Sequence, residues 1–104
     1  MKAEITNVQG YLVIHFTGEV DLNAQPHSRD IILNCLSLRR NTVVDLSAVT
    51  YIDSSGIASF VESYQLAKKY HLEFGLTNIS DAVTKVLHLA HLENVFPVYR
   101  SLSP

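Results

Sequence analysis

An apolar run followed closely by a helical pattern constrains the fold of this chain more than any other feature of its sequence. Residues 42–46 are apolar apart from Asp45, as in a strand buried on both faces. An apolar stripe with α-helical spacing starts at Ile57. The segment Asp53-Ser54-Ser55-Gly56 therefore stands where a strand leads into a helix. The first turn of a helix has unpaired N–H groups and a partial positive charge, so a serine there can cap the helix or receive a phosphate.

The beginning of the chain is predicted to form a β-hairpin. Residues 2–8 alternate loosely between apolar and polar side chains, and residues 11–17 are rich in β-branched and aromatic ones, which is typical of strands. Gln9-Gly10 supplies the turn, and residues 18–21 end the second strand. A helix is predicted over residues 22–38. Its N-cap is Asp21 or Asn23, its first turn holds Pro26, and its apolar stripe is Ala24, Ser28, Ile31, Cys35 and Leu38.

The clearest helix is predicted over residues 54–70. Its core-facing stripe is Ile57, Phe60, Val61, Tyr64 and Ala67. A helix on a sheet is expected to bury one stripe, so the opposite face is predicted to be exposed, with Ser59, Glu62, Ser63 and Lys69 on it.

The remaining segments complete the order ββαβαβαβ. Short strands are predicted at residues 71–77 and 95–99, the second confined to a sheet edge by Pro97. Between them, Ser80 caps a third helix with the stripe Val83, Val86, Leu87 and Ala90. Strands that alternate with helices pair in parallel through right-handed crossovers, and the opening hairpin makes the sheet mixed. We therefore predict one α/β domain over residues 1–104.

Composition excludes several classes of protein. The net charge is −2 and no more than two basic residues are adjacent, so the electrostatic footprint of a nucleic-acid-binding protein is missing. No apolar run approaches the ~20 residues of a membrane-spanning helix, and no apolar segment typical of a signal peptide follows Met1. Cys35 is the single cysteine and cannot form an internal disulfide, so we expect a cytoplasmic protein without direct membrane insertion.

Enzymatic and metal chemistry find little support in the sequence. Ile52 stands where the G-x-S-x-G nucleophile elbow of many hydrolases has its first glycine. His88 and His91 are spaced i, i+3, but two ligands without a third do not make a metal site. No glycine-rich phosphate-binding loop is present. We therefore expect a non-enzymatic protein with no catalytic residue, no metal and no cofactor.

The segment Asp53-Ser54-Ser55-Gly56 has two interpretations. Asp53 or Ser54 could simply cap the helix, with Gly56 allowing close packing of the backbone. However, the segment carries two hydroxyls where one cap suffices, and its glycine costs ~1 kcal/mol relative to alanine inside a helix. A small residue at position 56 would leave the neighbouring serine open to the active site of another protein.

Three parts of the sequence resemble the STAS domain of anti-sigma factor antagonists. The first runs from Val43 to Gly56 and includes D-S-S-G. The second is Gly18-Glu19-Val20-Asp21, which matches the family's G-E-[LV]-D, and the third lies between Leu76 and Phe96. The resemblance covers almost the whole chain in one register. It implies a small α/β domain, the STAS fold, with a mixed sheet and helices packed on one side.

The same resemblance implies a phosphorylation switch. The second serine of D-S-S-G is the acceptor in the family, which corresponds to Ser55, with Ser54 as a helix-capping neighbour. The implied partner is an anti-sigma factor with serine kinase activity, which uses ATP to phosphorylate the antagonist, and a phosphatase resets the cycle. Only the unphosphorylated antagonist binds and so frees the sigma factor. We expect the partner surface to comprise Glu19, Asp21, Asn23, Asp53, Ser54, Gly56, Ser59 and Glu62.

Two features keep an alternative open. The start of the first helix, residues 22–27, is not typical of the best-known antagonists and borders the implied partner surface. STAS relatives of similar length also serve as cytoplasmic subunits of ABC-type phospholipid transporters, where they dock on the ATPase subunit. Those subunits often carry a small residue in place of the acceptor serine, so Ser55 favours the switch.

Overall fold

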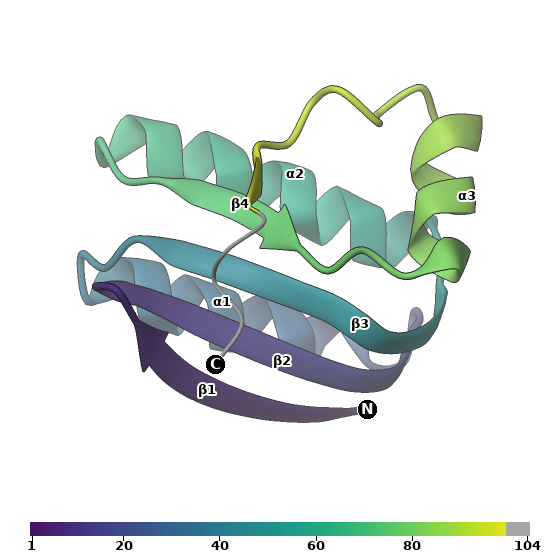
Figure 1. The fold of residues 1–104 in the computed structure, drawn as a ribbon, viewed down its shortest axis with the longest axis horizontal. Helices are drawn as coiled ribbons and strands as arrows, with labels where there is room; N and C mark the ends of the chain where they lie inside the picture. Colours follow the sequence, from purple (N-terminus) through teal and green to yellow (C-terminus); the bar gives the residue numbers. More distant parts are fainter. Residues whose placement is uncertain (100–104) are drawn as a thin grey trace.

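The computed structural model describes residues 1–99 of the chain and confirms the predicted order of elements (Figure 1). The elements are β1 (Lys2–Val8), β2 (Tyr11–Val20), α1 (Gln25–Ser37), β3 (Thr42–Ile52), α2 (Ser54–Lys69), β4 (Phe74–Thr77), α3 (Asp81–Leu89) and β5 (Val98–Tyr99). They form one sheet in the order β1-β2-β3-β4-β5. The β1–β2 pair is antiparallel and the other three pairs are parallel, so the sheet is mixed as predicted. Residues 100–104 of the predicted domain lie outside the described residues.

The main core lies on one face of the sheet, beneath the helices. Alternate residues of β2, such as Ile14 and Phe16, point to this face, where they meet Leu36 of α1, Phe60 of α2 and Val83 of α3. Figure 1 shows α1 and α2 behind the sheet and α3 at one end of it. All three helices therefore bury side chains in the same core, which agrees with the expectation of helices on one side.

The opposite face of the sheet holds a smaller apolar cluster and a polar network. Val13 and Val43 are fully buried there. Beside them, His15 of β2 links its neighbouring strands: its Nε2 lies 2.9 Å from Thr6 Oγ1 and its Nδ1 lies 3.0 Å from Asp45 Oδ2. The network explains how Asp45, the polar exception in the apolar run, is accommodated in a buried position.

The strands β2 and β3 are longer than the sequence predicts. β3 pairs with β4 only from Thr42 to Asp45, but it stays paired with β2 as far as Ile52. In its second half, Ser47, Thr50 and Tyr51 are exposed, and the Val49 carbonyl accepts a hydrogen bond from the Ser80 hydroxyl at 2.9 Å. β2 passes through two register shifts, and Gly18 adopts a φ of 97° that favours glycine.

The first helix differs from its prediction at both ends. It starts at Gln25, after the turn in which the Asp21 carboxylate accepts the Ala24 N–H at 2.9 Å. Its N-cap is Ala24, which makes no side-chain cap, so neither Asp21 nor Asn23 is the N-cap. The helix ends before Leu38, whose exposure contradicts its place in the apolar stripe.

The exposed position predicted for Ser59 and Ser63 is wrong. Ser59 is 1% exposed and Ser63 is 0% exposed. Each hydroxyl donates to a carbonyl of its own helix, Ser59 to Gly56 at 2.7 Å and Ser63 to Ser59 at 2.8 Å. Both buried hydroxyls therefore have a hydrogen-bond partner. Because α2 contacts α1 as well as the sheet, it buries a second face in addition to the predicted stripe.

The C-terminal half follows its prediction more closely. Ser80 is the N-cap of α3, with its Oγ accepting the Val83 N–H, and Val83 and Leu87 are buried. Ala90, the last residue of the predicted stripe, is exposed instead. β5 lies at the sheet edge as predicted, but it comprises only Val98–Tyr99, so Pro97 precedes the strand. β4 likewise starts later than predicted, at Phe74. Among residues 1–99 there is no helix with the length and hydropathy needed to span a membrane.

Candidate functional site at the start of helix α2

The junction between β3 and α2 is built around the Asp53 carboxylate. Asp53 has extended backbone angles and is the N-cap of α2. Its Oδ1 accepts the N–H groups of Ser55 at 3.0 Å and Gly56 at 3.2 Å, which satisfies two of the unpaired donors of the first turn. Asp53 thus makes the cap that the sequence assigned to either Asp53 or Ser54, so the expectation that Ser54 caps the helix is wrong.

The hydroxyl of Ser55 is bound to the same carboxylate. Ser55 Oγ donates to Asp53 Oδ1 at 2.5 Å, while Asp53 Oδ2 accepts the Leu22 N–H at 2.9 Å. These hydrogen bonds hold the pKa of Asp53 below its usual value, and the bond from the Ser55 hydroxyl has the largest effect. The carboxylate is therefore charged at neutral pH and faces the Ser55 oxygen directly.

The two serines of the motif differ in their surroundings. Ser54 is exposed and is the first residue of the helix, whereas Ser55 is half-buried and engaged with Asp53. Ser55 Oγ lies against the carboxylate that also accepts two main-chain N–H groups of the first turn. The position combines a nucleophilic hydroxyl with a helix N-terminus that favours an added anion.

Gly56 brings the start of α2 close to the end of β2. A Cβ at this position would lie 2.7 Å from the Val20 carbonyl oxygen and 2.8 Å from Ile52 Cγ1. Gly56 is also buried. Gly56 therefore allows the close backbone packing that the sequence predicted. Because it is buried, it does not belong to the predicted partner surface.

The structure brings together most of the predicted partner surface. Leu22 bonds to Asp53, so the segment with Asp21 and Asn23 lies against the first turn of α2. Among the eight predicted residues, Glu19, Asn23, Ser54 and Glu62 are exposed, Asp21 and Asp53 are half-buried, and Gly56 and Ser59 are buried. Ser59 is thus removed from the surface on which it was predicted to lie.

Glu62 is occupied by an ion pair that the sequence did not predict. Its two carboxylate oxygens accept hydrogen bonds from Arg29 Nε and Nη2 of α1, both at 2.7 Å. This bidentate contact lowers the pKa of Glu62. Because Arg29 and Glu62 come from different helices, no local pattern could have revealed the pair.

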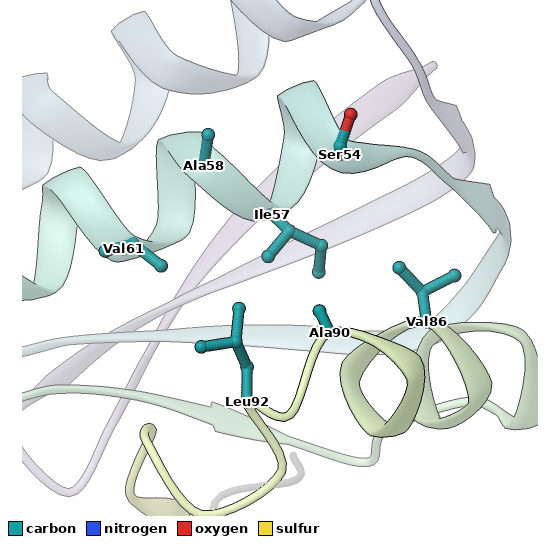
Figure 2. A pocket seen from close by; sticks show the side chains of 7 residues that line it. All are labelled: Ser54, Ile57, Ala58, Val61, Val86, Ala90 and Leu92. Carbon is teal, nitrogen blue, oxygen red and sulfur yellow. The ribbon is translucent and has the colours of Figure 1, made fainter.

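An apolar groove also borders the motif. Figure 2 shows it between the first turns of α2 and the end of α3, with Ser54 at one end, and its volume is about 390 Å³. Its lining residues are Ser54, Ile57, Ala58, Val61, Val86, Ala90 and Leu92. A partial sign was present in the sequence, since the predicted stripes of both helices contain residues that line the groove.

The histidines weighed as metal ligands are not arranged as a metal site. His88 Nδ1 lies 3.6 Å from Glu93 Oε1. No group of three histidine, cysteine or acidic side chains within the described residues 1–99 could hold a metal ion.

Several known proteins resemble this chain. A family model described as the STAS domain matches residues 2–103. A STAS-domain-containing protein of Pseudomonas aeruginosa is 30% identical over 87 residues, which cover 84% of this chain and 86% of the relative. The anti-sigma-B factor antagonist of Bacillus subtilis is 19% identical over 98 residues, 94% of this chain and 90% of the relative.

A solved structure extends the likeness to three dimensions. The crystal structure of an anti-sigma factor antagonist from Mycobacterium paratuberculosis matches with a TM-score of 0.84 and 26% identity. The match covers 94% of this chain and 84% of that one.

Proposed function

Because the chain belongs to the STAS domain family, we propose that it is an anti-sigma factor antagonist whose binding to its partner is switched by phosphorylation of Ser55. In this proposal the partner is a cytoplasmic anti-sigma factor with serine kinase activity that uses ATP, and a phosphatase restores the hydroxyl. The chain itself catalyses no reaction. Two of its relatives carry the name anti-sigma factor antagonist, which supports the class of partner.

The observation that carries the proposal is the position of the Ser55 hydroxyl. It is half-buried in the first turn of α2, 2.5 Å from the Asp53 carboxylate and next to the exposed Ser54. The apolar groove starts at Ser54, the residue before the acceptor, and offers a protein partner surface to bury. An acceptor next to an apolar surface suits a protein–protein contact that a single phosphate can interrupt.

The switch follows from charge. A phosphate on Ser55 adds about −1.5 to −2 charge and three acceptor oxygens next to the Asp53 carboxylate. Asp21, one residue before the Leu22 amide bound by Asp53, adds a further negative charge nearby. An interface closed over these groups would bury like charges, which repel more strongly where water is excluded. Within the free protein the helix N-terminus offsets part of this cost, by ~0.3–1 kcal/mol, so the fold survives while binding fails.

Mapping the phosphorylated residue tests the proposal. The chain and its Ser54→Ala and Ser55→Ala variants are incubated with the cognate anti-sigma kinase and ATP and analysed by mass spectrometry. We expect one phosphate in the wild type and in Ser54→Ala, located on Ser55, and none in Ser55→Ala. Phosphate on Ser54 alone would overturn the assignment. An unmodified chain that binds the ATPase subunit of a phospholipid transporter would support the alternative function.

A further inference from the structure

The Asp53 side chain connects two segments that are far apart in the sequence. Its Oδ1 holds the Ser55 hydroxyl and the first turn of α2, while its Oδ2 holds the backbone N–H of Leu22 at 2.9 Å. Leu22 belongs to the loop of residues 21–24 between β2 and α1, and its side chain is 70% exposed. One carboxylate therefore fixes both the phosphate acceptor and an exposed apolar residue beside it.

Phosphorylation changes what Asp53 faces. Transfer of the γ-phosphoryl group of ATP forms an Oγ–P bond on Ser55 and breaks the bond between the γ-phosphorus and ADP. ADP leaves, and so does the hydroxyl proton, for which Asp53 Oδ1 is already the hydrogen-bond acceptor. Ser55 Oγ then has no hydrogen to donate, and a phosphate dianion stands next to the carboxylate. The phosphate oxygens also compete with Oδ1 for the N–H groups of Ser55 and Gly56.

We propose that phosphorylation of Ser55 displaces the Asp53 carboxylate and releases the Leu22 N–H, so that the loop of residues 21–24 changes together with the acceptor. This inference rests on the proposed function. It makes the loop a second part of the switch: the phosphate acts on the partner directly by its charge and indirectly by moving the exposed Leu22 side chain. The Ala24 N–H in the same loop is bound by Asp21 instead, through the side chain at 2.9 Å and the main-chain carbonyl at 3.1 Å.

Amide exchange measured by NMR tests the coupling without any partner or kinase. The ¹⁵N-labelled chain is prepared unmodified and with phosphoserine incorporated at position 55 during translation, as verified by mass spectrometry. Loss of a hydrogen bond to a charged acceptor should speed exchange of the Leu22 amide with water by about tenfold or more. The Ala24 amide is the internal control and should keep its rate. An unchanged Leu22 rate in the phosphorylated chain would overturn the proposal.

A matched control separates this coupling from a general effect of charge. Phosphoserine is incorporated at position 54, whose exposed side chain is not among the hydrogen-bond partners of Asp53, and we expect the Leu22 rate to stay at its unmodified value. Equal acceleration by phosphate at 54 and at 55 would contradict the role of Asp53. Partner binding is measured on the same samples. Lost binding with an unchanged Leu22 rate would refute the coupling and leave the switch intact, whereas retained binding with a faster Leu22 rate would refute the switch alone.

Discussion

The hydroxyl of Ser59 donates to the carbonyl oxygen of Gly56 at 2.7 Å, one turn earlier in α2, and the Ser59 side chain is 1% exposed. The neighbouring Ala58 is exposed and lines the apolar groove. Ala58 and Ser59 are adjacent in the sequence, but only Ser59 is buried. Substitutions at the two positions can therefore distinguish an effect on domain stability from an effect on the proposed binding surface.

The first prediction compares arginine at these two positions. Ser59→Arg places a charge in the core, and burying an unpaired charge is strongly destabilising, by roughly 3–5 kcal/mol. Ala58→Arg changes only the surface, so its effect on the free energy of unfolding should stay within about 0.5 kcal/mol, while partner binding weakens. Urea unfolding and a binding titration measure both. A stable Ser59→Arg variant would mean that α2 is rotated from the orientation described.

The second prediction concerns Phe60, which is fully buried in the main core between α2 and the sheet. Phe60→Ala leaves a cavity and should lower the free energy of unfolding by ~3–5 kcal/mol. Urea unfolding followed by circular dichroism gives the value. A loss below 1 kcal/mol would be inconsistent with the position of Phe60 in the core.

The third prediction concerns Gly56. Gly56→Ala forces a methyl group to within 2.7 Å of the Val20 carbonyl oxygen, so the start of α2 must move away from β2 at a cost of roughly 1–3 kcal/mol. Gly10→Ala is the control, since a Cβ there meets nothing within 4 Å and only the φ of 87° opposes it. Thermal unfolding compares the two. If Gly56→Ala is as stable as the wild type, the close approach of α2 to β2 is not required.

The fourth prediction concerns the pKa of Asp53, which the hydrogen bond from the Ser55 hydroxyl lowers more than any other contact. A carboxyl whose pKa is lower in the folded state stabilises the fold above its unfolded pKa, and the effect is lost as pH falls through the folded pKa. Ser55→Ala should therefore raise the pKa of Asp53 and move acid unfolding to higher pH. Ser54→Ala should do neither. Carboxyl ¹³C NMR titration measures the pKa, and an identical titration of Asp53 in wild type and Ser55→Ala would exclude the interaction.

Much of the fold can be predicted because its elements carry clear local patterns. The stripe with Phe60 sets the core face of α2, and Ser80 marks the start of α3. The errors arise where tertiary contacts override the local pattern. Ser59 and Ser63 look like surface residues, yet their hydroxyls are satisfied by the helix itself, so α2 can bury them.

The candidate site shows the same division between local and distant contacts. The proposed acceptor Ser55 and the N-cap Asp53 lie within four consecutive residues, so a sequence motif could suggest them. The hydrogen bond from Leu22 to Asp53 and the ion pair of Arg29 with Glu62 join residues that are 31 and 33 positions apart. The apolar groove likewise exists only where α2 and α3 meet. Features of this kind depend on the arrangement of helices and strands, which no local pattern specifies.

The central claim is that charge on Ser55, rather than loss of the fold, controls partner binding. Its direct test is the affinity of the anti-sigma partner for the wild type, Ser55→Ala and Ser55→Asp, measured by isothermal titration calorimetry in a buffer without ATP. Ser55→Ala should bind like the wild type, and Ser55→Asp should bind ~1–3 kcal/mol more weakly, or about 5- to 150-fold. Circular dichroism melts of both variants should remain near that of the wild type. Equal affinity of Ser55→Asp and the wild type would contradict the account.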